Sequence, residues 1–383
     1  MIKLPLSLYV HIPWCVRKCP YCDFNSHEQA GALPEKAYLT ALLEDLDCDA
    51  RYIQGRELVS IFFGGGTPSL FSPEFFQAFL IAVNSRIAFS DSIEITVEAN
   101  PGTYEHGKFE EYRQAGINRL SIGVQSFNAD ALTTLGRIHN RNDAIRAIEA
   151  VHNAGFDNFN IDLMHGLPQQ TVKLALSDLN NAIDLEPTHI SWYQLTIEPN
   201  TVFYRTQPTL PNEDTLDGIF DNGLKTLQDA AYAQYEVSAF AKKNCQSKHN
   251  KNYWQFGDYL GIGAGAHGKL SYLNERSQPI IMRTRKTRLP QDYLRAAPSD
   301  RNVESQFIQD KDKPYEFMMN ALRLKQGVNA DLFAERTFLP LDVLNSNLSS
   351  LRKKALLVED PSRLQTTDTG FRFLNDVVMS FTD

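Results

Sequence analysis

Long hydrophobic runs and a surplus of basic residues are both missing from this 383-residue sequence. The longest apolar stretch, residues 75–83, is interrupted by Gln77 and is far too short to span a bilayer. The first 14 residues hold one early lysine but no apolar core followed by a small-residue cleavage site, so we expect no secretory signal peptide there. The formal net charge of -8 gives no electrostatic footprint for nucleic acid or for an anionic membrane surface.

Cysteine is scarce as well. The chain has five cysteines, an odd number, which does not suit the disulfide framework of a small secreted protein and fits a reducing compartment. Hydrophobic residues make up 43% of the sequence, an ordinary share for a chain that buries a sizeable core. We therefore expect a soluble, cytoplasmic globular protein with no nucleic-acid partner and no transmembrane segment.

Three of the five cysteines lie within eight positions near the start of the chain, at Cys15, Cys19 and Cys22. Thiolates at this spacing can converge on one side of a tight loop and hold three irons of a four-iron cluster. The fourth iron would then lack a protein ligand and could bind an exchangeable one. The spacing therefore predicts an open [4Fe-4S] cluster.

Two other sites compete with this interpretation. A structural zinc ion would need a fourth ligand, and His11 or His27 could supply it, but closed zinc sites usually consist of two well-separated ligand pairs. A redox pair of Cys19 and Cys22 would leave the first cysteine unexplained, and we rank it below zinc. Asp23, where a histidine would be needed, excludes the signal for covalent haem attachment.

Strand and helix patterns alternate over the first half of the chain. The predicted strands are residues 6–12, 58–63, 93–98, 119–124, 159–164 and 189–196, and the predicted helices are residues 34–53, 73–86, 108–115, 142–154 and 172–184. Six such repeats imply parallel strands joined by right-handed crossovers. We expect an α/β fold, a partial (β/α)6 barrel of TIM type, with its chemistry at the C-terminal ends of the strands.

The pattern loosens after residue 199. We expect a helix over 216–231, a strand over 235–238, a polar turn around KHNKNYW (residues 248–254) and a linker or loop layer over 270–302. Helices at 314–325, 341–351 and 371–381 surround a hairpin of 355–359 with 364–367 and resemble a winged-helix domain. Thirteen acidic and 11 basic residues from position 300 onward leave no basic face for phosphates, which favours a structural or partner-docking role over DNA binding. The predicted units are 1–240, a core barrel; 241–300, a connecting segment; and 301–383, the winged-helix-like domain.

The cysteine triad, with Tyr21 just before its last member, resembles the cluster loop of the radical S-adenosylmethionine (SAM) superfamily. In that family the open iron is chelated by the amino and carboxylate groups of SAM. The GGGTP stretch after the second strand looks like the family's glycine motif, which would contact the amino end of SAM through Gly65, Gly66 and Thr67. Glycines there also let the backbone approach a ligand closely.

Further polar residues follow the predicted strands, and each alone also fits a structural role such as an ion pair that anchors a loop. As a set they resemble the SAM-contacting residues of the coproporphyrinogen dehydrogenase-like branch of the superfamily. The resemblance assigns SAM contacts to Tyr9, Tyr21, Glu98, Gln125, Arg137 and Asp162.

This branch holds oxygen-independent coproporphyrinogen III dehydrogenases and haem chaperones. The dehydrogenases carry another cysteine where this chain has Phe24, and a longer arm before the triad than the 14 residues found here. Both differences favour the chaperones, which share an H-N-x-x-Y-W motif that this chain matches at residues 249–254.

The resemblance implies that haem binds at His249, Asn250, Tyr253 and Trp254. A neutral imidazole is a good axial ligand for haem iron, and aromatic rings offer flat surface to a porphyrin. In an arbitrary protein, however, a His-Asn turn followed by aromatics is more often a helix cap packed on a core. His267, in GIGAGAHG, is the second candidate among the histidines.

The function that we infer from the resemblance is haem binding and delivery to acceptor haem proteins, which the sequence does not identify. The alternative is a coproporphyrinogen III dehydrogenase. An open iron can pass one electron to SAM and split it into methionine and a 5′-deoxyadenosyl radical, and the residues leave open whether haem transfer uses that step. We expect any membrane contact to be made through a client protein.

Overall fold

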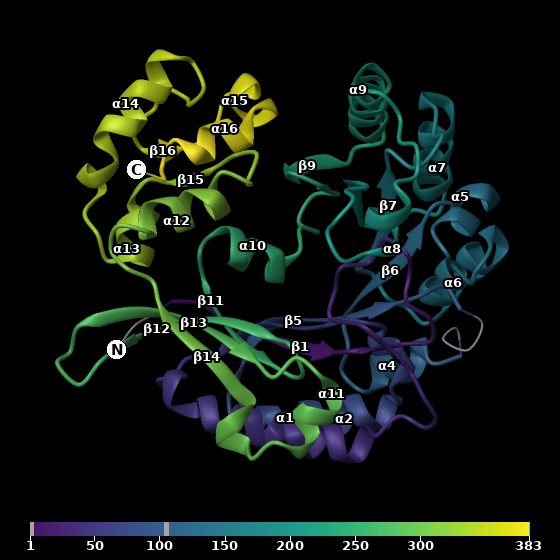
Figure 1. The fold of residues 1–383 in the computed structure, drawn as a ribbon, viewed down its shortest axis with the longest axis horizontal. Helices are drawn as coiled ribbons and strands as arrows, with labels where there is room; N and C mark the ends of the chain where they lie inside the picture. The colour runs from purple at the N-terminus through teal and green to yellow at the C-terminus, as the bar shows by residue number, and fades with distance from the viewer. Residues whose placement is uncertain (1–3, 103–106, 383) are drawn as a thin grey trace.

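The computed structural model describes residues 4–102 and 107–382, and twelve strands of this part of the chain form one sheet (Figure 1). In spatial order the strands are β14 (Asn302–Phe307), β13 (Pro279–Lys286), β12 (His267–Leu273), β11 (Asp258–Ile262), β1 (Leu6–Ile12), β4 (Leu58–Gly65), β5 (Phe89–Ala99), β6 (Arg119–Gln125), β7 (Phe159–His165), β8 (His189–Gln194), β10 (Ala239–Ala241) and β9 (Ala233–Glu236).

The six strands from β1 to β8 in that order run parallel to one another, and β11 adds a seventh parallel strand beside β1. Their sequences are nearly continuous apolar and β-branched runs because both faces of the sheet are covered, and β6 is buried at every position. The predicted partial barrel of six parallel strands is therefore confirmed. Its C-terminal strand ends lie on one side, where the cysteine loop also lies.

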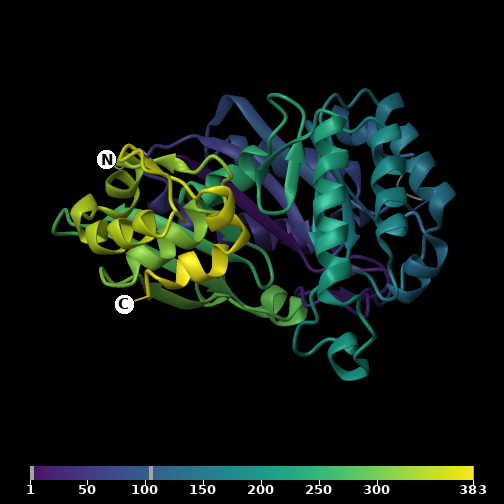
Figure 2. The same ribbon diagram turned by 90° about the horizontal axis from the view of Figure 1, so that it is seen from above.

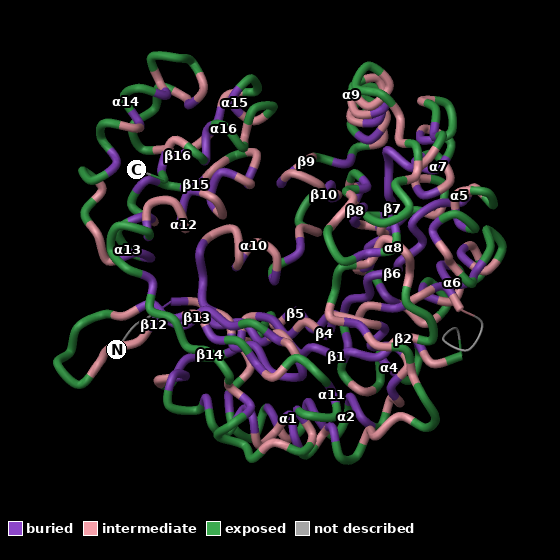
Figure 3. The backbone as a smooth tube through the Cα atoms, in the orientation of Figure 1, coloured by how far each residue is buried: buried purple, intermediate pink, exposed green. Residues whose placement is uncertain are grey.

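Helices cover the outside of the parallel strands (Figure 1). They are α1 (Glu35–Asp49), η1 (Ala50–Tyr52), α2 (Pro73–Asn84), α4 (Phe109–Gln114), α5 (Ala129–Thr134), α6 (Arg141–Asn153), α7 (Val172–Asp184) and α9 (Glu213–Asp229), whereas the short helices η2 (Pro68–Leu70) and α8 (Val202–Thr206) lie in the loops that follow β4 and β8. Most start at a side-chain cap; Asn140, for example, forms a capping box with Asp143 at the start of α6. In Figure 3 the strands are mostly buried, whereas the outward faces of these helices are exposed.

The predicted linker over 270–302 was wrong. These residues contain most of β12, all of β13, α11 (Pro290–Arg295) and η3 (Pro298–Arg301), and β14 begins at residue 302. The strands have no simple alternation because both of their faces are packed: Met282 belongs to the barrel core and its neighbour Ile281 to the core of the C-terminal domain. Two adjacent apolar residues therefore point to opposite faces.

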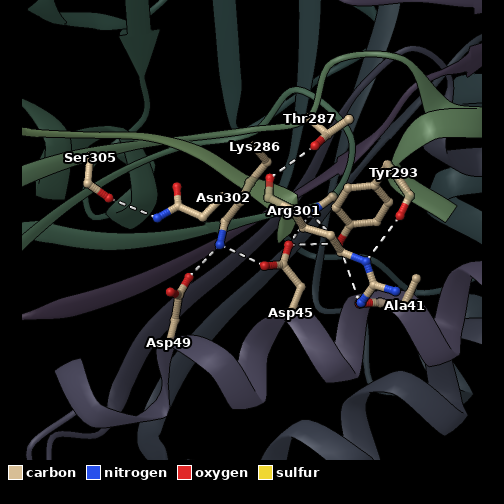
Figure 4. Close-up of polar contacts among 10 residues, drawn as sticks. Ala41, Asp45, Asp49, Lys286, Thr287, Tyr293, Arg301, Asn302 and Ser305 are labelled. Atoms are coloured by element: carbon tan, nitrogen blue, oxygen red, sulfur yellow. Dashed lines mark hydrogen bonds and ion pairs between the residues drawn. The ribbon is translucent and has the colours of Figure 1, made fainter. Parts of the chain in front are cut away.

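A buried charge cluster fastens β13 to α1 (Figure 4). The Lys286 ammonium donates to Asp45 at 2.6 Å and to Asp49 at 2.8 Å, and the Tyr293 hydroxyl donates to Asp45 at 2.7 Å. Arg301 donates to the Ala41 carbonyl at 2.9 Å. Since buried charges are tolerated only when they are paired and hydrogen-bonded, this cluster fixes the position of the added strands against the barrel.

The predicted polar turn around KHNKNYW was also wrong, because residues 248–254 form helix α10 (Lys248–Trp254). Its first backbone amides are satisfied by the Ser247 hydroxyl and by the carboxylate of Glu94, which accepts from Lys248 at 3.0 Å and from His249 at 3.0 Å. Glu94 lies on β5, far away in sequence. Figure 1 shows α10 in the middle of the molecule, between the sheet and the C-terminal domain.

The C-terminal domain is mainly helical. Figure 2 shows it at the opposite end of the molecule from the blue and teal helices α6, α7 and α9. Its elements are α12 (Lys313–Ala321), β15 (Val328–Asn329), α13 (Asp331–Thr337), η4 (Leu341–Leu344), α14 (Asn345–Lys353), β16 (Arg363–Leu364), α15 (Asp368–Arg372) and α16 (Leu374–Met379). The predicted hairpin is reduced to one antiparallel bridge, Leu357 to Thr366, while β16 pairs with β15. None of the helices in the described ranges is long and apolar enough to cross a membrane.

Candidate functional site

The three cysteines lie on a loop that leaves the C-terminal end of β1. Two short strands, β2 (Trp14–Cys15) and β3 (His27–Glu28), pair in parallel and close this loop. Inside it the backbone amide of Cys22 donates to the Cys19 carbonyl at 3.2 Å. All three thiols are free, partly exposed, and line one cavity of about 500 Å³, which we call the cluster cavity.

The surroundings of the thiols fit an iron-sulfur cluster better than zinc. Both ring nitrogens of His11 are hydrogen-bonded, to the Tyr9 hydroxyl at 2.9 Å and to the Asn25 carbonyl at 2.9 Å, and His27 is bonded to the Asn25 side chain at 3.2 Å. Within the described part of the chain, no three His, Cys, Asp or Glu side chains are grouped closely enough to hold a single metal ion. Three open thiols on one cavity instead match a larger cluster.

Donors to the cysteine sulfurs come from the loop and from the barrel. The Ser26 hydroxyl is hydrogen-bonded to Cys22 Sγ at 3.6 Å, and the Arg137 guanidinium donates to Cys19 Sγ at 3.6 Å. Burial raises the pKa of the Cys15 and Cys22 thiols, while the nearby hydroxyls oppose that shift. Such hydrogen bonds to sulfur are among the contacts by which proteins adjust a bound cluster.

The glycine loop packs tightly against the cysteine loop. The backbone amide of Gly66 donates to the Ile12 carbonyl at 2.7 Å, and that of Thr67 donates to the Trp14 carbonyl at 2.7 Å. A Cβ atom at Gly66 would lie 2.5 Å from the Trp14 carbonyl oxygen, and Gly65 has a φ of 115°. Only glycine fits this close approach, so the motif holds the two loops together beside the cavity.

Two partly buried carboxyl groups line the same cavity, Glu98 near the end of β5 and Asp162 in the middle of β7. Glu98 accepts from the Gly65 amide at 3.2 Å, and Asp162 accepts from the Ser121 hydroxyl at 2.9 Å and from Asn160 at 2.8 Å. Burial, together with the negative charge of Asp162, raises the pKa of Glu98 to about 8. Burial also raises the pKa of Asp162. The cavity therefore contains two acidic groups, Glu98 and Asp162, and a cationic ligand would stabilise their ionised forms.

Arg137 is a partly buried cation that lines the same cavity. Its guanidinium donates to Asn100 at 2.5 Å and to the Gly123 carbonyl at 2.7 Å, and its Nε has no hydrogen-bond partner among the described residues. Gln125, with a φ of 68°, accepts from the Tyr193 hydroxyl at 2.7 Å. A ligand carboxylate would suit the unpaired guanidinium donor.

Eight of the nine residues predicted to contact SAM line the cluster cavity: Tyr21, Gly65, Gly66, Thr67, Glu98, Gln125, Arg137 and Asp162. Tyr9 lies elsewhere, in a second cavity on the other side of the glycine loop. Sequence reasoning missed Asn100, Ser121 and Tyr193, which also line the cluster cavity. Asn100 directly follows β5, so its place at a strand end was a usable signal.

The residues of the H-N-x-x-Y-W motif lie on two different faces of helix α10. Asn250 and Trp254, four residues apart, line the cluster cavity. His249 and Tyr253 point the other way: the His249 ring nitrogens are bonded to the Ser60 hydroxyl at 2.8 Å and to the Tyr253 hydroxyl at 3.0 Å, and the ring stacks on Phe62. Burial lowers the pKa of His249 to about 3. His249 is thus neutral but has both nitrogens occupied.

The C-terminal domain supplies part of the cavity wall. The Arg323 guanidinium lies over the Trp254 ring, 4.3 Å from its centroid, and 3.6 Å from the Glu236 carboxylate. Arg323 Nε and the Trp254 indole nitrogen are buried and have no partner within the described residues. Both residues line the cluster cavity, although these two N–H groups themselves are not exposed to it.

Comparison with known proteins agrees with this geometry. Residues 9–179 match the family model of the Radical SAM superfamily, and residues 308–373 match the HemN C-terminal domain. "Heme chaperone HemW" of Escherichia coli (strain K12) is 49% identical over 384 residues, which cover 100% of this chain and 99% of the relative. The protein of the same name from Haemophilus influenzae is 49% identical over 386 residues, covering 100% and 99%.

The solved structure of Coproporphyrinogen III oxidase (HemN) from Escherichia coli has the same fold. It superimposes with a TM-score of 0.83 at 21% identity, covering 100% of this chain and 91% of HemN. At this identity the likeness shows the fold alone, whereas the end-to-end likeness to the HemW proteins shows the family. The chain belongs to the HemW/HemN-like family of radical SAM proteins, and the two relatives that are 49% identical from end to end are HemW proteins.

Proposed function

We propose that this protein is a haem chaperone, which binds haem and delivers it to acceptor haem proteins. The observation that carries the proposal is the 49% identity, from end to end, with proteins named "Heme chaperone HemW". The H-N-x-x-Y-W motif, by which haem chaperones differ from coproporphyrinogen III dehydrogenases, adds support. Residues 249–254 match it, and two of them line the cluster cavity.

In this proposal Cys15, Cys19 and Cys22 bind a [4Fe-4S] cluster, and SAM binds exchangeably over its open iron. Bound together, the two groups supply one-electron reductive cleavage of SAM. In this proposal the chain's own residues hold the ligand: the glycine loop and Arg137 line the cavity beside the cysteines, and Glu98 with Asp162 favours the positive charge of SAM.

The wall formed by α10 and the C-terminal domain is proposed to take part in haem binding. Trp254 offers a flat ring that is already stacked with the Arg323 guanidinium, and both side chains line the cluster cavity. Asn250 adds an amide on the same face of the helix. A porphyrin combines an apolar face with carboxylate groups, and this wall offers a partner for each.

The alternative function is oxidative decarboxylation of coproporphyrinogen III. In this chain the position of the additional dehydrogenase cysteine is held by Phe24, whose side chain is 60% exposed and cannot bind iron. The absence of this cysteine favours the haem-chaperone function over decarboxylation.

Anaerobic SAM cleavage by the reduced, cluster-reconstituted protein distinguishes the two functions. We expect the yield of 5′-deoxyadenosine to be the same with and without coproporphyrinogen III, and the porphyrinogen to remain intact. Consumption of coproporphyrinogen III in step with SAM would overturn the proposal. A Cys19→Ser variant, which lacks one cluster ligand, measures the background.

We further propose a cytoplasmic location, with membrane contact made through acceptor proteins. Washed membranes from cells that express a candidate membrane-bound acceptor should retain the protein, and membranes lacking that acceptor should not. Equal retention by both would count against contact through a client.

A further inference from the structure

A second cavity of about 500 Å³ adjoins the cluster cavity. Asp23, Phe24, Gly65 and Glu98 line both cavities, so the glycine loop and the end of the cysteine loop form their common border. The second cavity is bounded on its other sides by α10 and by the strands β11 to β13, which were not expected to form part of the sheet.

His267 is the exposed histidine of this cavity. It opens β12 and lies directly opposite Arg285 on β13, so the two side chains project from the same face of the sheet. Neither ring nitrogen of His267 has a hydrogen-bond partner among the described residues. Partial burial and the neighbouring Arg285 and Arg283 lower its pKa, which leaves the imidazole neutral and able to bind a metal at physiological pH.

Cations and aromatic rings complete the cavity. Arg285 is paired with Glu304 at 2.8 Å, but both side chains are about half exposed, and exposed pairs of this kind are weak. Arg288 uses its Nε to donate to Asn25 at 3.2 Å. Aromatic surface comes from Tyr253, on the His249 face of α10, and from the exposed ring of Phe24.

A free imidazole, two arginines and aromatic rings around one cavity are the set of groups that a haem needs. The imidazole binds iron, the rings cover the apolar face of the porphyrin, and the guanidinium groups pair with the propionates. By contrast, both ring nitrogens of His249 are occupied, so it would have to give up its bond to Ser60 or to Tyr253, and the ring is held by its packing on Phe62.

We propose that haem binds in this second cavity, with His267 as the axial ligand of the iron and Arg285 and Arg288 as partners of the propionates. The inference rests on the proposed haem-chaperone function and adds to it a second binding position, in which the iron is ligated, next to the wall of Trp254 and Arg323 in the cluster cavity. In this position the haem lies beside the cluster cavity and shares a border with the residues proposed to hold SAM.

The test is an anaerobic titration of the cluster-reconstituted full chain with haemin, followed by Soret absorbance and by electron paramagnetic resonance of the ferric iron. Four proteins are compared: wild type, His267→Ala, His249→Ala and His152→Ala. His152 is an exposed histidine on the outer helix α6 and serves as the matched control. Iron and sulfide content is measured for each, so that loss of the cluster is not mistaken for loss of haem binding.

We expect His267→Ala to weaken haemin binding by about tenfold or more, to change the spectrum of the ferric iron, and to recover a histidine-like spectrum when imidazole is added. His249→Ala and His152→Ala should keep the wild-type spectrum. If wild type binds haemin and His267→Ala binds it equally well with the same spectrum, the inference is overturned while the chaperone proposal stands. If wild type binds haemin no better than a control protein, the chaperone proposal itself fails.

Haemin dimethyl ester, which lacks the free carboxylates, tests the two arginines separately. Wild type should bind haemin at least about tenfold more tightly than the ester. In the Arg285→Ala, Arg288→Ala double variant this preference should disappear, with the spectrum of the bound iron unchanged. A preference that survives in the double variant would show that the propionates lie elsewhere.

Discussion

Glu98 should make SAM binding depend on pH. Its carboxyl group lies at the end of β5, where burial and the nearby charge of Asp162 raise its pKa to about 8. SAM carries positive charge on its sulfonium and ammonium groups, and a positive charge close to a carboxyl group favours the ionised form. Below pH 8, SAM binding should therefore expel a proton from Glu98.

The raised pKa of Glu98 determines how strongly SAM affinity should depend on pH. With a pKa of about 8, Glu98 is ionised in about 1% of empty sites at pH 6 and in about half of them at pH 8. If only the ionised form binds SAM tightly, the affinity rises by up to about fiftyfold over this range. The direction of the pKa shift of Glu98 decides that SAM affinity rises with pH, because a carboxyl group with a raised pKa loses its proton only as the pH increases.

Anaerobic calorimetric titration with SAM at pH 6, 7 and 8, in buffers of different ionisation enthalpy, measures both the affinity and the protons released. In Glu98→Gln the affinity should be low and nearly independent of pH. Glu110→Gln, at an exposed position of α4, should behave as wild type. A wild-type affinity that is constant from pH 6 to 8, with no proton released, would refute the reasoning.

Three further changes test other parts of the account. Lys286→Met leaves Asp45 and Asp49 buried without their cation and should lower the free energy of unfolding in urea by about 3–5 kcal/mol; an unchanged unfolding midpoint would contradict the pairing. Gly66→Ala adds a Cβ where no space exists and should weaken SAM binding by about tenfold or more, as titration would reveal, with the cluster content retained. Cys22→Ser should lower the iron and sulfide content after reconstitution, and a full complement of iron would exclude this residue as a ligand.

The sequence was sufficient to predict the barrel, because the barrel strands are buried on both faces and thus appear as continuous apolar runs. The family resemblance assigned Glu98 and Asp162 to one site, and this agrees with the expectation that the chemistry gathers where parallel strands end at one edge of a sheet. The structure brings both of them to the cluster cavity together with the three cysteines. Tyr9 shows the limit of this argument, since its position on β1 turns its side chain toward the second cavity.

Elements that depend on distant partners could not be found in this way. Helix α10 has only seven residues, and its first amides rely on Glu94 from β5, so its own sequence gives little sign of a helix. Strand β13 packs on two cores and carries Lys286, whose charge is balanced by α1. The same long-range packing turns His249 inward and leaves His267 exposed, a distinction that motif matching cannot make.

The delivery of haem to an acceptor is the most direct measure of the central claim. Haem-loaded, cluster-reconstituted protein is mixed anaerobically with the apo form of a candidate haem enzyme, and haem bound to serum albumin at the same concentration is the control. The account predicts that the acceptor gains haem and activity faster than from albumin, while the chain loses haem in equal amount. If the chain retains no haem after gel filtration, or the acceptor gains haem no faster than from albumin, the protein is not a haem chaperone.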